Sequence, residues 1–122
     1  MITHPKAGDV VVFLPNGNEK SHYYVRRVIA TPGDTVLIQD GAVYVNGQFY
    51  SEKTEVASID DPGIAGEEIK LGKDEYFVLG DNRNNSTDSR DPMVGNIHRD
   101  DILGRAWLRI WPLSKFELLE HQ

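Results

Sequence analysis

Short apolar runs alternate with polar turns along most of the chain. Residues 10–14, for example, form an unbroken run of valine, phenylalanine and leucine that stops at Pro15. Runs of this length between glycine, proline, asparagine or aspartate are typical of strands, and no segment shows a convincing helical period. We therefore predict strands at residues 10–14, 22–30, 35–39, 42–45, 48–50, 67–71, 75–79 and 102–111.

The turns between these strands are tight. Asp40-Gly41 and Asn46-Gly47 are strong signals for hairpin turns, and residues 31–34 place proline and glycine in succession, as a type II turn requires. Many short strands joined by glycine turns predict an all-β fold, a small antiparallel β-barrel-like domain. The length fits one such domain over residues 1–122.

Two segments fit no strand clearly. Residues 51–66 lack periodicity and contain Asp60-Asp61-Pro62-Gly63, so we predict a long exposed loop there. The tail at residues 113–122 is compatible with a strand or with one helical turn, and its pattern leaves both open.

The predicted strand at residues 22–30 carries two adjacent arginines, Arg26 and Arg27. Because successive side chains of a strand point to opposite faces, each face holds one arginine among apolar neighbours. In one interpretation, both guanidinium groups reach solvent or pair at a strand edge. In the other, one of them contacts the polar segment that follows residue 79.

That segment, residues 80–90, is called the polar loop below. It contains glycine, aspartate, asparagine, serine, threonine and two arginines, which favour turns over strands. A calcium site is excluded, because the central glycine and closing glutamate of an EF-hand are missing and Arg83 adds positive charge. We expect instead a rigid network of carboxylates and guanidinium groups that positions a ligand or substrate. Its expected members are Arg27, Asp81, Arg83, Asp88 and Arg90.

Composition excludes several classes of function. The formal charge is -6 and the basic residues are scattered, so nucleic acid is not an expected partner. Without cysteine there is no disulfide, thiol nucleophile or thiolate metal site, and the four histidines lack metal-ligand spacing. The sequence leaves a serine-histidine-aspartate triad open, although it contains no G-x-S-x-G nucleophile elbow. No apolar run approaches the roughly 20 residues of a membrane span and no signal peptide is visible, so the chain as written is expected to be soluble.

Three motifs in order resemble those of bacterial type I signal peptidases, the serine-lysine endopeptidases that remove signal peptides. Residues 5–13 resemble PKxGDIVVF, residues 24–34 resemble YVKRVIGxPGD, and residues 80–90 match GDNRxNSxDSR at nearly every position. Residues 41–47 and 104–106 resemble two further segments, DGxVYVNG and GRA. The resemblance implies the signal peptidase I type of β domain and a mechanism without cofactor or metal.

The resemblance also implies roles for individual residues. In the family, the nucleophilic serine lies in an SMxPT motif that follows a membrane anchor, and this chain contains neither. Arg26 occupies the position of the general-base lysine; its guanidinium stays protonated and is not expected to act as a base. Ser86 matches the serine that hydrogen-bonds that lysine. Two structural ion pairs are expected, Arg27 with Asp81 and Asp88 with Arg90.

Two hypotheses follow. The first is the extracytoplasmic domain of a type I signal peptidase, present as an inactive fragment or altered form, which would bind the signal peptides of secreted preproteins as an extended strand. The alternative is a non-catalytic signal-peptidase-like protein acting in surface pilus assembly in a Gram-positive bacterium, with pilin subunits as partners. In both, the parent protein would be anchored at the extracytoplasmic face of the plasma membrane.

Overall fold

The computed structural model describes residues 4–15, 22–52 and 57–104. Nine strands and two short 3-10 helices lie within these ranges. The strands are β1 (Val10–Phe13), β2 (Tyr24–Ala30), β3 (Thr35–Gln39), β4 (Ala42–Val45), β5 (Gln48–Phe49), β6 (Ile69–Lys70), β7 (Glu75–Leu79), β8 (Ile97–His98) and β9 (Ile102–Gly104). The 3-10 helices are η2 (Gly63–Gly66) and η3 (Arg99–Asp101).

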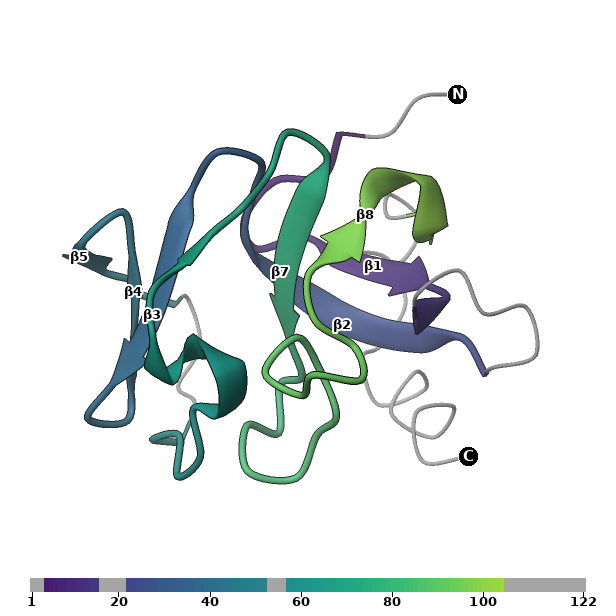
Figure 1. Cartoon of the computed structure of the whole chain (residues 1–122). Coiled ribbons are helices and arrows are strands. Elements are labelled where there is room, and N and C mark those ends of the chain that lie inside the picture. Colours follow the sequence, from purple (N-terminus) through teal and green to yellow (C-terminus); the bar gives the residue numbers. More distant parts are fainter. Residues whose placement is uncertain (1–3, 16–21, 53–56, 105–122) are drawn as a thin grey trace.

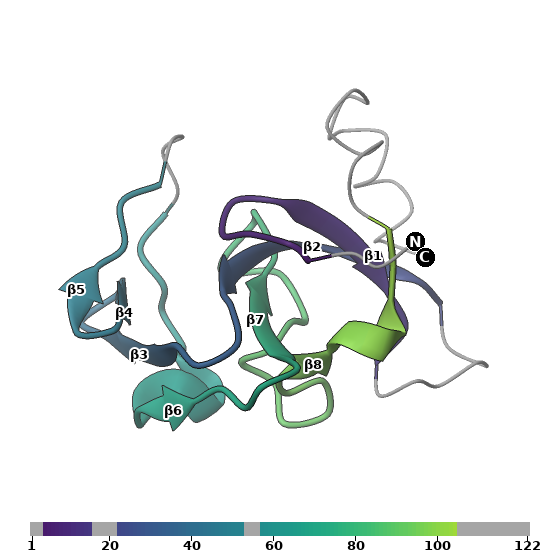
Figure 2. The ribbon, with the colours of Figure 1, turned by 90° about the horizontal axis from the view of Figure 1, so that it is seen from above.

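These strands form two antiparallel sheets that lie side by side (Figures 1 and 2). The larger sheet has the order β8-β7-β2-β1-β9, and the smaller has the order β5-β4-β3-β6. The chain passes between them twice, from β2 into β3 and from β6 into β7. The prediction of an all-β, barrel-like antiparallel fold is therefore confirmed. No helix in the described part of the chain has the length and apolar character needed to cross a membrane.

Strands β2 and β7 are buried on both faces, which explains their nearly continuous apolar sequences. On β7, Phe77 and Leu79 join a core cluster shared with β3 and β4. The alternate residues, Tyr76 and Val78, join a second cluster shared with β1 and β8. The end of β7, from which the polar loop departs, is therefore fixed by packing from both sides.

The expectation of an exposed loop at residues 51–66 is wrong in part. Most of its described residues are exposed, but Ile59 and Ala65 are buried in the first core cluster, and Ala65 lies on η2. Two isolated apolar residues among polar ones have no period, so the sequence pattern could not distinguish them from surface residues.

Other differences concern the bounds of the strands. β2 begins at Tyr24 instead of residue 22, and the strand predicted at residues 67–71 is reduced to Ile69–Lys70. The two-residue β8, which pairs with the start of β7, was not predicted because it is too short to show alternation. Of the strand predicted at residues 102–111, the first three form β9. The remainder and the tail at 113–122 lie outside the described residues, so the single domain over 1–122 stays a prediction.

Asp34 links the turn between β2 and β3 to the turn between β4 and β5. Its carboxylate accepts hydrogen bonds from the backbone N–H of Thr31 at 2.9 Å and from the side-chain amide of Asn46 at 2.9 Å. Burial raises the pKa of this carboxyl group, but the hydrogen bonds outweigh burial, and the pKa lies below its ordinary value. The charged form of Asp34 therefore stabilises the folded state.

We predict that Asp34→Asn destabilises the protein at neutral pH but hardly at all in acid. A carboxyl group with a lowered folded pKa contributes its full stability above its unfolded pKa of about 4, and loses it as pH falls through the folded value. Because Asp34 is partly exposed, the loss at pH 7 should be about 1 kcal/mol or less. Urea denaturation at pH 7 and pH 3 measures it. Asp100→Asn, an exposed carboxylate, is the control, and an equal loss at both pH values would contradict the prediction.

Candidate functional site

The polar loop leaves the end of β7 and is held around Gly80 (Figure 1). The N–H of Gly80 donates to Oδ2 of Asp88 at 2.9 Å, and its carbonyl accepts from Nε of Arg83 at 2.8 Å. A Cβ atom at residue 80 would lie 1.9 Å from Oγ of Ser86 and 3.5 Å from Cδ of Arg26. Glycine is therefore required here, because Ser86 and Arg26 both pack close to its backbone.

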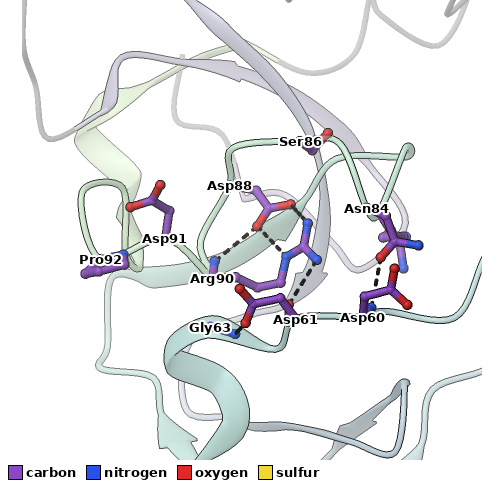
Figure 3. A pocket seen from close by; sticks show the side chains of 10 residues that line it. Asp60, Asp61, Gly63, Asn84, Ser86, Asp88, Arg90, Asp91 and Pro92 are labelled. Carbon is purple, nitrogen blue, oxygen red and sulfur yellow. Dashed lines mark hydrogen bonds and ion pairs between the residues drawn. The ribbon is translucent and has the colours of Figure 1, made fainter.

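Asp88 and Arg90 form the buried centre of the loop (Figure 3). Oδ1 of Asp88 accepts from Nε of Arg90 at 2.8 Å, and Oδ2 accepts from Nη2 at 2.8 Å, which gives the bidentate geometry that binds guanidinium groups most strongly. The Asp88 side chain is 0% exposed and that of Arg90 is 9% exposed. Both members of this expected pair are brought together.

Arg27 and Asp81 form a second bidentate pair, between β2 and the loop. Nε and Nη2 of Arg27 each donate to one oxygen of Asp81 at 2.9 Å, and Nη1 donates to the carbonyl of Gly8 at 2.9 Å. Hydrogen bonding to Asp81 is the largest effect on Arg27 and, against the effect of burial, raises its pKa above the usual value. This pair is more open than the first, since each side chain is 27% exposed.

Arg83 has a partner that the sequence analysis missed. It was expected to bind a carboxylate of the loop itself, but its Nη1 and Nη2 donate to the two oxygens of Glu52, 31 residues earlier in the chain. The Arg83 side chain is only 1% exposed and that of Glu52 is 11% exposed. No motif or hydrophobic pattern in the local sequence indicates that Glu52 pairs with Arg83. Glu52 lies in the segment for which the sequence predicts an exposed loop.

The side chain of Arg26 is buried and contacts the polar loop at Thr87. Its Nε donates to the carbonyl of Thr87 at 2.8 Å and its Nη1 to the carbonyl of Val25 at 2.8 Å. The guanidinium carbon also lies 4.8 Å from the ring centre of Tyr24, within the range of a cation–π contact. The interpretation in which both arginines of this strand lie at a solvent edge is wrong, because Arg26 and Arg27 both contact the polar loop.

A cavity of about 360 Å³ separates the polar loop from residues 60–63 (Figure 3). Ser86, Asp88 and Arg90 form part of its wall. Asn84 closes one side, since its amide accepts from the N–H of Asp60 and donates to the carbonyl of Ser58, both at 2.9 Å. The described residues contain no group of three or more His, Asp or Glu side chains arranged to hold a metal ion.

This arrangement suits binding better than proton transfer at position 26. A guanidinium group with donors on two backbone carbonyls stays charged and cannot accept a proton from a hydroxyl. Ser86 lies beside it across Gly80. The roles inferred for Arg26 and Ser86 from the family resemblance stay predictions.

The Asp88–Arg90 pair is more buried than the Arg27–Asp81 pair, and Asp88 also accepts from the backbone N–H groups of Gly80 and Arg90. We predict that Asp88→Ala destabilises the protein by about 3 kcal/mol, because it leaves the Arg90 cation buried without its carboxylate. Asp81→Ala removes a bidentate pair at a more exposed position and should cost about 1 kcal/mol or less. Urea denaturation of both variants measures the two losses, and equal losses would contradict the prediction.

Comparison with known proteins gives consistent relatives. A family model described as "Signal peptidase, peptidase S26" matches residues 1–111. A probable signal peptidase I-2 of Synechocystis sp. is 40% identical over 119 residues, covering 94% of this chain and 52% of the relative. Signal peptidase I P of Bacillus subtilis subsp. natto is 40% identical over 117 residues, covering 90% of this chain and 62% of the relative. The chain thus spans 52% and 62% of the length of these two relatives.

A solved structure also matches the fold. The crystal structure of a signal peptidase I from Enterococcus faecalis V583 has a TM-score of 0.63 and 27% sequence identity to this chain. The match covers 87% of this chain and 99% of the Enterococcus chain. The all-β fold is therefore shared with a known signal peptidase I structure.

Proposed function

The chain belongs to the signal peptidase family, peptidase S26, and on that basis we propose that it binds signal peptides in extended form without hydrolysing them. The observation that carries this proposal is the side chain at position 26. The family motif has its general-base lysine there, and this chain has a buried arginine. A lysine in such surroundings can lose its proton near neutral pH and activate a serine, whereas an arginine cannot.

The hydrogen bonds of Arg26 support a structural role for its cation. Its Nε and Nη1 donors are directed at the carbonyls of Thr87 and Val25. Hydrogen bonds from a charged donor are among the stronger ones, and the one to Thr87 holds the polar loop against β2. Arginine at this position thus stabilises the same loop that a lysine would use for catalysis.

A small apolar surface beside position 27 supports peptide binding. Val25 of β2 is buried against Val10 and Val12 of β1, apart from the two larger core clusters. Val10 and Val12 are only half-buried, and in the β1–β2 register they share a face with Val25 and Arg27, so they leave apolar surface beside Arg27, on the face of the sheet opposite to Arg26. This surface has the chemistry to receive a small aliphatic side chain of an extended peptide, such as the small residue that precedes the cleavage site of a signal peptide.

The site of action follows from the proposed ligand. Signal peptides emerge on the far side of the plasma membrane, so we place the chain at the extracytoplasmic face, within a membrane-anchored parent protein. The alternative function, in surface pilus assembly with pilin subunits as partners, is favoured by one observation. Arg26 donates to two backbone carbonyls and lies over the ring of Tyr24, as expected of a site that has adapted to a non-catalytic role.

The proposal predicts that hydrolysis requires two changes together. Residues 1–122 contain no SMxPT motif, so a segment that carries this motif is joined in front of Pro5. Arg26→Lys is made with and without that segment, so that the unmodified chain, each single change and both changes together give four proteins. A quenched fluorescent signal peptide reports cleavage, and fluorescence anisotropy of a labelled peptide reports binding. We expect all four proteins to bind the peptide with similar affinity and only the protein with both changes to cleave it.

Two controls make the result specific. Replacing the grafted serine by alanine should abolish cleavage, and replacing the small residue before the cleavage site by tryptophan should weaken binding, because the apolar surface is small. Cleavage by any protein that retains Arg26 would refute the proposal. If the protein with both changes binds the peptide but fails to cleave it, the site has diverged beyond position 26, and the pilus-assembly alternative gains support.

A further inference from the structure

Glu52 and Arg83 connect the smaller sheet to the polar loop. Tyr50 is still bound to that sheet, since its N–H donates to the carbonyl of Val43 on β4 at 2.9 Å. Two residues later, Glu52 accepts from both terminal nitrogens of Arg83, with one distance of 2.6 Å. The ion pair therefore attaches the polar loop to the segment after β5, which carries none of the site residues expected from the sequence.

Arg83 also binds Gly80, so the restraint that Glu52 places on Arg83 extends to Gly80. Its third donor, Nε, binds the carbonyl of Gly80 at 2.8 Å, while Asp88 binds the N–H of the same residue. Gly80 is thus held at both its N–H and its carbonyl. Its Cα lies against Ser86 and Arg26 so closely that even a methyl group would collide with Ser86. A displacement of the Gly80 carbonyl would therefore move the backbone against which these two side chains pack.

Packing alone does not hold Glu52 and Arg83 in place. A cavity of about 290 Å³ borders both side chains, with Val43, Phe49 and Ile59 among its walls. The Glu52 carboxylate therefore has room to turn away from Arg83. Without its carboxylate, the Arg83 cation would be buried and unpaired, which drives it to leave its position and to release Gly80.

We propose that Glu52 is a positioning residue for the peptide site at Arg26 and Ser86, acting through Arg83 and Gly80. The effect on peptide binding rests on the function proposed above, whereas the effect on the polar loop does not. The ion pair makes the geometry of the site depend on the position of residues 50–52. A change at this end of the smaller sheet is thereby transmitted to the peptide site.

The test compares Glu52→Gln, which removes the charge and keeps the shape, with Glu68→Gln, the same change at an exposed glutamate. We expect Glu52→Gln to weaken peptide binding about tenfold and to speed hydrogen exchange of the Gly80 N–H about tenfold. The core amide of Val28, which donates to the carbonyl of Asp9 at 2.8 Å, should keep its exchange rate, which shows that the fold is intact. Glu52→Asp, which retains the charge, should recover part of both effects, and Glu68→Gln should change neither.

The outcomes separate the two proposals. If the unmodified chain binds no signal peptide, the proposed function fails, and exchange at Gly80 still decides whether Glu52 positions the loop. If the unmodified chain binds the peptide and Glu52→Gln binds it equally well, the positioning role is refuted. It is also refuted if exchange at Gly80 is unchanged, or if Val28 is affected as strongly as Gly80, since that result indicates general destabilisation.

Discussion

Arg83, Asp88 and Arg90 carry full charges on side chains that are at most 9% exposed. An unpaired ion in such a place costs several kcal/mol, which is a large part of the stability of a small domain. Each of these charges must therefore find an opposite charge or a backbone dipole within hydrogen-bonding distance. The path of the polar loop follows from that requirement, because its turns bring Asp88 to Arg90 and the Gly80 carbonyl to Arg83.

The same requirement explains how the loop is held without regular secondary structure. Charged groups replace the backbone pairing that a strand would provide, and they attach the loop to two separate parts of the fold. On β2, Arg27 binds Asp81 and Arg26 binds the carbonyl of Thr87, and beyond β5, Glu52 binds Arg83. Because β2 is packed on both faces, the attachments through Arg26 and Arg27 are made to a closely packed strand.

Local sequence predicted the features that depend on neighbours in the chain. The alternation at β3 and β4 and the Asp-Gly and Asn-Gly turns gave strands whose bounds match the structure, because side-chain direction and turn geometry are set within a few residues. Features that depend on distant partners were missed. Glu52 has no local mark of its pairing with Arg83, and Ile59 and Ala65 become core residues only because β3 and β4 lie beneath them.

That residue 26 cannot act as a base is a prediction of a different kind. A family motif fixes its place, and the chemistry of the head group then decides what it can do. The loop around it does not depend on that chemistry. The pairs formed by Arg27, Arg83 and Arg90 stabilise the fold whether or not residue 26 can accept a proton, since none of them needs a neutral amine. A chain that does not catalyse hydrolysis would still be stabilised by these pairs. For this reason, a polar loop that matches the family motif is evidence for the fold, whereas evidence for hydrolysis has to come from the residue at position 26 and its nucleophile.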